Sequence, residues 1–270
     1  MNREFDREYI RDEFRKLDAD VGGGLALYLI GGGAMAFHDI KDATKDIDVV
    51  VLGGDDVRSL RSALESQGYR VVKAVDTEYD QLGTQLILEN EDGCRFDVFY
   101  RQVVDKLVFS ASMQERSRPI DGTDEPAVFV AAPEDIFLFK AVAGRTGDIT
   151  DMNTLVQTGL DFDAIVDEIE TQIELRGEEF FVTFINEALG DLEERFNVTT
   201  PVHTLVESIS VRVYEQLEIL RHIETETTID ALEAVVDIPE DRIGDRLDEL
   251  EEKGNIRRGD GTVVLIAERP

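Results

Sequence analysis

Two aspartates at the start of an apolar run are the residues whose type and spacing point most directly to chemistry. Asp46 and Asp48 open the run DIDVVVL, which has the composition of a buried β-strand. Residues i and i+2 of a strand project from the same face, so the two carboxylates are expected side by side. Because unpaired carboxylates are costly to bury, a divalent cation is their expected partner. Mg²⁺ suits carboxylates that leave room for water and phosphate oxygens.

A third carboxylate lies further along the chain. Asp97 stands in the run CRFDVFY, between Phe96 and Val98, where an acidic side chain needs a partner. If this strand neighbours the strand of Asp46 and Asp48, three carboxylates meet. They could then hold two Mg²⁺ ions about 3.5–4 Å apart, an arrangement that serves in-line phosphoryl or nucleotidyl transfer.

A run of three glycines precedes the aspartates. Gly31, Gly32 and Gly33 follow the strand-like run LALYLI and lead into a short predicted helix, Ala34–Ile40. Glycine lets backbone N–H groups approach phosphate oxygens because no Cβ stands in the way, and a helix N-terminus favours anions. Taken alone, the glycines are more simply interpreted as a tight turn. Taken alone, the aspartates are more simply interpreted as the solvated end of a strand. Together, the two motifs predict a metal-dependent phosphate site.

This combination resembles the nucleotidyltransferase superfamily of the polymerase-β-type fold, and within it the small prokaryotic branch that includes AbiEii-type toxins. The superfamily signature is Gly-Gly or Gly-Ser, a spacer, Asp-apolar-Asp and a third acid on a later strand. The glycines, Asp46, Asp48 and Asp97 match it within residues 20–160. The resemblance implies that the three aspartates are metal ligands and that Asp97 is a candidate base. Gly33 stands at the end of the glycine motif in place of a hydroxyl residue, so that side-chain contact to phosphate is lacking.

The same branch carries a lysine, an Ala-Gly-Arg and two aspartates on a later helix. The run KAVAGRTGDITD supplies Lys140, Arg145, Asp148 and Asp151, with Gly147 where a lysine is common. The resemblance implies that Lys140 and Arg145 counter the charge of a bound triphosphate. The alternative is that both pair with the two aspartates and only fix the end of the helix.

Acidic residues dominate the whole chain. It has 270 residues with 59 Asp and Glu against 28 Lys and Arg, a formal net charge of −31. Concentrated salt screens the repulsion of such a surface, so the composition is typical of a halophilic archaeon. A single cysteine excludes an internal disulfide and a cysteine-rich zinc site. The charged N-terminal stretch and the lack of a long apolar run predict a cytoplasmic protein with no membrane span.

Hydrophobic periodicity predicts an α/β (α+β) fold. Helical and strand-like runs alternate up to residue 160; RVVKAV, TQLILEN and CRFDVFY are predicted strands, and the last two are joined by the hairpin turn NEDG. We therefore expect a nucleotidyltransferase-type mixed sheet with flanking helices over residues 1–160. Residues 161–200 have a helical, acidic pattern and are expected to form a connector.

Residues 201–270 are predicted to form a winged helix-turn-helix, because three helical runs precede two short β-runs joined by GDG. Such a domain commonly places its second turn helix in the DNA major groove. The candidate helix, Glu240–Gly254, offers Arg242, Arg246 and Lys253 among seven acids, which is a poor surface for phosphates. DNA binding and contact with a protein, either an antitoxin or a second copy of the chain, therefore both stay open.

The function expected from these residues is nucleotidyl transfer. The NMP of an NTP would pass to an acceptor hydroxyl on RNA such as a tRNA end, on a protein or on a small molecule. By resemblance, the chain would act as the toxin of a toxin–antitoxin pair. The alternative is a non-catalytic nucleotidyltransferase-like scaffold, fused to a winged-helix regulator or protein-interaction module.

Overall fold

The computed structural model describes residues 3–17, 24–72, 86–124 and 126–266. The chain divides into two units, Met1–His203 and Thr204–Pro270. The predicted strand over residues 70–75 and the start of the one over 84–90 fall partly outside the described residues. In the described part of the chain, no helix is long and apolar enough to cross a membrane.

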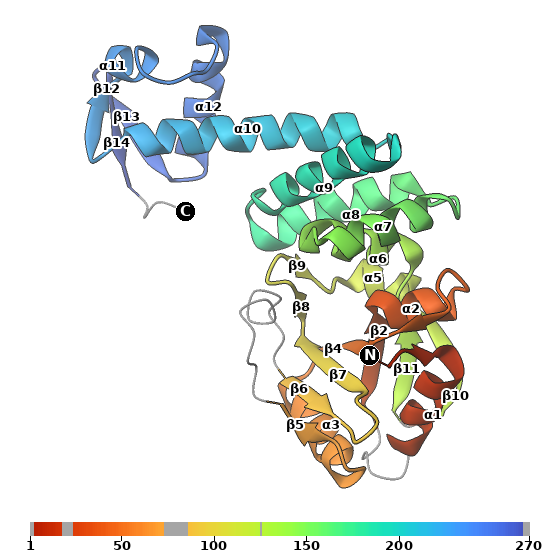
Figure 1. The fold of residues 1–270 in the computed structure, drawn as a ribbon. Helices are drawn as coiled ribbons and strands as arrows, with labels where there is room; N and C mark the ends of the chain where they lie inside the picture. Colours follow the sequence, from red (N-terminus) through yellow and green to blue (C-terminus); the bar gives the residue numbers. More distant parts are fainter. Residues whose placement is uncertain (1–2, 18–23, 73–85, 125, 267–270) are drawn as a thin grey trace. The chain divides into compact units, whose positions relative to one another are not determined.

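A mixed α/β architecture with flanking helices, as expected from the sequence, forms the first unit (Figure 1). Its described residues include a seven-stranded sheet in the order β10-β11-β2-β4-β7-β6-β5. Strand β2 is parallel to β11 and antiparallel to β4, whereas β4 is parallel to β7. In sheet order, the strands are Arg118–Asp124, Ala127–Val130, Ala26–Ile30, Asp46–Val51, Arg95–Tyr100, Leu86–Glu89 and Arg70–Val71.

The central strands form because their residues are apolar on both faces, as in a sheet that is covered on both sides. Val49, Val50 and Val51 of β4 are all fully buried. Strand β6 pairs antiparallel with β7, and the Asn90 side chain accepts hydrogen bonds from two backbone N–H groups of the turn between them. The predicted hairpin at NEDG is therefore confirmed.

Helices of the first unit surround this sheet and pack on one another. Helix α6 begins with Pro133 at its first position, where a missing N–H costs nothing. It is buried along most of its length because it contacts α2, α7, α8 and α9. The helices are α1 Arg7–Leu17, α2 Gly31–Phe37, α3 Gly54–Ser66, α5 Ala111–Arg116, α6 Pro133–Ala143, α7 Thr146–Val156, α8 Phe162–Arg176 and α9 Phe181–Phe196.

A buried ion-pair cluster fastens three of these helices together. The Arg116 guanidinium of α5 lies 2.6 Å from the Asp135 carboxylate of α6 and 2.5 Å from the Glu168 carboxylate of α8. Both carboxylates are fully buried. Residues 161–200, predicted to be a helical connector, thus form α8 and α9, which pack against α6 within the first unit.

Two short strand pairs, and the edge of the sheet that β10 and β11 form, were not expected from the sequence. Strand β1, Phe5–Asp6, pairs with β3, Ala43–Thr44, and β8, Gln102–Val103, pairs with β9, Leu107–Val108. Strands β10 and β11 and helix α5 also had no predicted counterpart. The paired strands β1, β3, β8 and β9 have two residues each and so no periodicity to reveal them. Strand β10 has seven residues, RPIDGTD, but it contains Pro119 and Gly122, which are depleted in strands.

The second unit consists of helices around a small antiparallel sheet in the order β12-β14-β13. Helix α12 buries Ile243, Leu247 and Leu250 in the apolar core of this unit, at the spacing of one helix face. The predicted helical runs and the turn at GDG are present, whereas the first strand was not predicted. The elements are α10 His203–His222, β12 Glu226–Thr228, α11 Ile229–Glu233, α12 Glu240–Glu252, β13 Ile256–Gly259 and β14 Thr262–Leu265.

Candidate functional site

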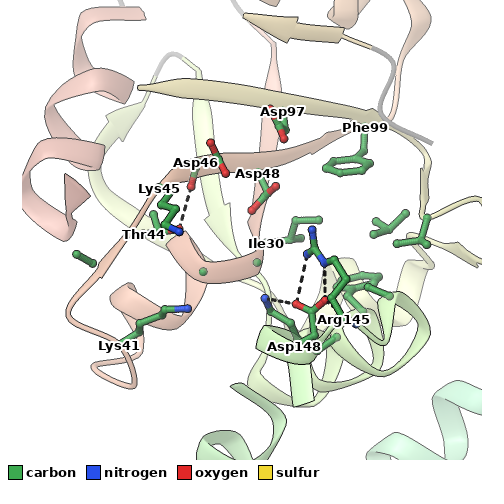
Figure 2. A pocket seen from close by; sticks show the side chains of 18 of the residues that line it. Ile30, Lys41, Thr44, Lys45, Asp46, Asp48, Asp97, Phe99, Arg145 and Asp148 are labelled. Atoms are coloured by element: carbon green, nitrogen blue, oxygen red, sulfur yellow. Dashed lines mark hydrogen bonds and ion pairs between the residues drawn. The ribbon is translucent and has the colours of Figure 1, made fainter. Parts of the chain in front are cut away.

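The structure brings the three predicted aspartates together at one face of the sheet. Strands β4 and β7 pair in parallel with Asp48 opposite Asp97 and Asp46 opposite Arg95. Residues opposite each other in paired strands project to the same side, and Asp46 is two residues from Asp48. All three aspartates line one cavity of about 320 Å³, in which Figure 2 shows them as neighbours.

Burial and mutual repulsion disfavour the charged form of these aspartates. Asp97 is buried, and this burial, followed by the charge of Asp48, raises its pKa to about 8. Burial, followed by the charge of Asp46, raises the pKa of Asp48 to about 6. The pKa of Asp46 is also raised, chiefly by burial. The three carboxyl groups therefore hold their protons more strongly than free aspartates do, because the nearby cations do not compensate for burial and repulsion.

Arg95 is a site residue whose contacts the sequence analysis did not anticipate. Its Nη2 atom lies 3.3 Å from Asp97 Oδ1, and its Nε atom lies 3.9 Å from Asp46 Oδ1. The signal was present in the sequence, because Arg95 precedes Asp97 by two residues and so shares its strand face. The aspartates thus have a cationic side chain of the protein among them.

Gly31 leaves room for Asp48 where strand β2 ends. Its φ is +63°, and a Cβ built on it would lie 2.3 Å from Asp48 Oδ2. An L side chain would be strained in this conformation and would also collide with the carboxylate. Gly31 is therefore required by the position of Asp48.

The other two predicted glycines differ in their surroundings. Gly32 lines the cavity with Gly31, and a Cβ on it would lie 2.6 Å from Thr44 Oγ1. A Cβ on Gly33 would instead meet the Leu29 side chain at 3.0 Å, and Gly33 is not among the residues that line the cavity. The structure thus brings Gly31 and Gly32 to the aspartates and turns Gly33 toward the core.

The opposite wall of the cavity carries Lys140 and Arg145. Lys140 Nζ lies 2.8 Å from Asp148 Oδ1 and 2.9 Å from Asp151 Oδ2, and Arg145 Nε lies 2.6 Å from Asp148 Oδ2. Gly144, with a left-handed φ of +62°, ends α6 and turns the chain into α7 between the two cations. The pairing considered as the alternative in the sequence is therefore present, yet both cations also line the cavity. Figure 2 shows Arg145 beside Asp148.

Two further lysines line the cavity and were missed by the sequence analysis. Lys41 Nζ lies 3.0 Å from Asp151 Oδ1, so this lysine joins the ion-pair group of Lys140. Lys45, which immediately precedes Asp46, is exposed at the rim. Both lie in the spacer between the glycines and the aspartates, where their position relative to a cavity is not readable from the sequence.

Apolar residues complete the wall of the cavity. This wall consists of Ile30, Phe99, Val103, Val104, Phe139 and Ala143. Val104 has a φ of +60°, which is rare for a β-branched residue. The cavity therefore has an anionic, a cationic and an apolar part, which matches a ligand that has a metal ion, phosphates and a nucleobase.

The donor set suits Mg²⁺ through its chemistry, because carboxylate oxygens are the ligands that this ion prefers. Among the described residues, however, no group of three or more His, Cys, Asp or Glu side chains is already arranged to hold a metal ion. Metal binding would therefore require the aspartates to adjust. The cost of burying three neighbouring carboxylates is the feature of this structure that a divalent cation would offset.

Comparisons with known proteins do not identify the chain. No protein-family model matches the sequence, and no curated protein is significantly similar to it. The residues of the cavity are therefore the ground on which a function is proposed.

Proposed function

We propose that the first unit is a metal-dependent nucleotidyltransferase with a polymerase-β-type fold. It would move NMP from an NTP to an acceptor hydroxyl on RNA, protein or a small molecule. The observation that carries the proposal is the placement of three aspartates on neighbouring strands across one cavity from Lys140 and Arg145. A nucleoside triphosphate with its Mg²⁺ ions needs both groups, the carboxylates for the metal and the cations for the phosphates.

Asp46 and Asp48 would hold Mg²⁺, with Asp97 as the third ligand. When bound, Mg²⁺ would supply alignment of the reacting oxygens and stabilisation of the leaving group. The acceptor oxygen forms a bond to the α-phosphorus while the bond from that phosphorus to the bridging oxygen breaks, and pyrophosphate leaves. Asp97 is the candidate base that takes the hydroxyl proton on a carboxylate oxygen.

The cationic wall would hold the phosphates. The side chain of Arg145 is 44% exposed and that of Lys140 is 12% exposed, so Arg145 is the more accessible to a ligand. A planar guanidinium can donate two parallel hydrogen bonds to phosphate oxygens. Lys140 would contribute a fixed charge, because Asp148 and Asp151 hold its ammonium group in place.

Label transfer tests this proposal. The protein is incubated in about 3 M KCl, which screens its acidic surface, with Mg²⁺, each of the four α-labelled NTPs and a pool of tRNA. We expect labelled RNA or labelled protein, together with released pyrophosphate, and a loss of several orders of magnitude in the variant with Asp46→Asn and Asp48→Asn. Asp92→Asn, which removes an exposed carboxylate, is the control. Failure of the wild-type protein to release pyrophosphate with any NTP and acceptor would contradict the proposal.

A non-catalytic scaffold is the second candidate function, and one observation favours it. Lys140 and Arg145 are both held by Asp148, so a triphosphate would have to compete with a carboxylate of the protein for the same cations. On this alternative, the unit binds nucleotide or a partner without transfer. Calorimetry tests this alternative. It is established if the wild type binds nucleotide, the double Asn variant does not, and neither protein releases pyrophosphate.

We propose that the second unit is a winged helix that contacts protein, either an antitoxin or a second copy of the chain. The order of its helices and its three-stranded sheet supports the fold. Arg242 and Arg246 of α12, offered by the sequence for DNA, lie 2.8 and 3.0 Å from the Glu215 carboxylate of α10. Arg258 is held 2.9 Å from Glu251. These pairs leave little positive charge for phosphates.

Titration of the whole chain against labelled duplex DNA tests the role of the second unit. We expect no change in anisotropy at low or high KCl, and a dimer or a complex with a co-expressed partner by light scattering. Binding of DNA that weakens steeply with KCl would show counterion release and contradict the proposal.

A further inference from the structure

The guanidinium of Arg95 lies among the carboxylates proposed to hold the metal. Arg95 is in register with Asp46 on β4 and two residues from Asp97 on its own strand. Its Nη2 atom is 3.3 Å from Asp97 Oδ1, and its Nε atom is 3.9 Å from Asp46 Oδ1. A positive charge of the protein thus lies close to two of the carboxylates that would attract a metal ion.

The contacts of Arg95 are unequal among the three aspartates. The Asp97 side chain is 4% exposed and that of Arg95 is 20% exposed, so this pair is largely removed from water. A charge pair at this depth is screened less than a surface pair. Asp48, in contrast, has Lys140 and Arg145 as its nearby cationic influences. Arg95 therefore neutralises Asp97 first and Asp46 second.

A second carboxylate is within reach of Arg95 on the other side. Glu89 of β6 is in register with Arg95, as Asp46 is on β4. Residues opposite each other in a sheet have Cβ atoms about 4.5–5.5 Å apart, so a long arginine side chain can pair with either neighbour. Arg95 has a position to move to when it leaves the aspartates.

We propose that Arg95 is an internal counter-cation that competes with divalent metal for Asp46 and Asp97. Without metal, it offsets part of the charge of the cluster and keeps the strands together. Metal bound through Asp97 must displace it, so the concentration of Mg²⁺ that fills the site is higher than the aspartates alone would require. The inference rests on the proposed metal site and adds to it a residue that sets its affinity.

Binding of Mg²⁺ to the intact chain without nucleotide tests this role. Arg95→Met removes the charge and keeps a long side chain, Arg95→Gln keeps a hydrogen-bond donor for Asp97, and Arg95→Lys keeps the charge. Arg70→Met is the matched control, because Arg70 is an exposed arginine of the same sheet and its loss changes the net charge equally. Calorimetry is performed at one pH and one KCl concentration.

We expect Arg95→Met and Arg95→Gln to bind Mg²⁺ about tenfold more tightly than the wild type, as removal of a competing charge implies. Arg95→Lys and Arg70→Met should bind like the wild type. In EDTA, Arg95→Met should melt at a lower temperature than the wild type, and saturating Mg²⁺ should remove or reverse that difference. A merely structural role would leave the difference the same with and without Mg²⁺.

The outcomes separate this inference from the proposed function. If the wild type binds Mg²⁺ and both neutral variants bind it equally tightly or more weakly, the proposed role of Arg95 is wrong, whereas the proposed metal site remains. Absence of Mg²⁺ binding in the wild type and in all variants would overturn the metal site and, with it, the role of Arg95. Because Arg95→Gln is measured in parallel, the result does not depend on whether Arg95→Met folds.

Discussion

Asp97→Asn should make the metal-free protein more stable relative to the wild type as pH rises. The Asp97 carboxyl is buried, and its pKa is raised from 3.8 to about 8. Between these values, the folded state holds a proton that the unfolded state has lost, so the stability of the wild type falls as pH increases. The stabilising contribution is complete below about pH 4 and is lost as pH passes through about 8. The asparagine variant has no such titration.

The size of this pH effect on the free energy of unfolding follows from the pH interval between the two pKa values. One pH unit corresponds to about 1.4 kcal/mol for one proton, so the interval from pH 5 to pH 8 sets an upper bound of about 4 kcal/mol. Local relaxation around the buried carboxylate reduces this value, and we expect about 2 kcal/mol. For a unit of this size, that corresponds to about 4–8 °C in the melting temperature.

Thermal unfolding followed by circular dichroism, in EDTA and at one KCl concentration, measures this effect. Asp97→Asn also alters the contact with Arg95, so the informative quantity is how the difference between variant and wild type changes from pH 5 to pH 8. Asp92→Asn serves as a control, because it removes an exposed carboxylate. A gap between variant and wild type that is the same at pH 5 and pH 8 would refute the reasoning.

Three other predictions concern the glycine turn, the buried ion pairs and the acidic surface. Gly31→Ala should destabilise the fold by about 1–3 kcal/mol and weaken Mg²⁺ binding in calorimetry, because its Cβ would collide with Asp48; an unchanged affinity would count against the contact. Arg116→Met should cost about 3–5 kcal/mol in thermal unfolding, since it leaves two fully buried carboxylates without their partner, and a loss below 1 kcal/mol would show that water reaches them. The melting temperature should rise between about 0.1 and 3 M KCl as repulsion is screened, and a salt-independent value would contradict the halophilic interpretation of the composition.

The sequence predicted those features of the candidate site that depend on residues close together in the chain. Alternation along a strand places Asp46 and Asp48 on one face, and a turn of Asn and Gly residues between apolar runs places the strand of Asp97 next to another strand. The spacing of apolar residues along α12 similarly shows which face is buried. These features depend on near neighbours in the chain.

The remaining features depend on contacts between distant segments. The sequence does not show that β11 pairs with β2, because parallel pairing is set by the packing of the whole sheet. Nor does it show that Lys41 reaches Asp151, which is 110 residues away. The different surroundings of Gly33 could not be predicted for the same reason, since whether a glycine faces a cavity or the core depends on the side chains that surround it.

The anionic wall of the cavity is synthesised before the cationic wall, and this order affects how the nascent chain folds. The carboxylates lie on β4 and β7, whereas the cations that face them lie on and beyond α6, more than 30 residues after β7 ends at Tyr100. Because synthesis is vectorial and N-terminal segments emerge first, a chain exposed only as far as β7 carries its aspartates with Lys41, Lys45 and Arg95 as nearby cations but without Lys140 and Arg145. The intracellular salt must balance the remaining charge until α7 has been translated. Early folding of the sheet is therefore expected to be more sensitive to ionic strength than the completed unit.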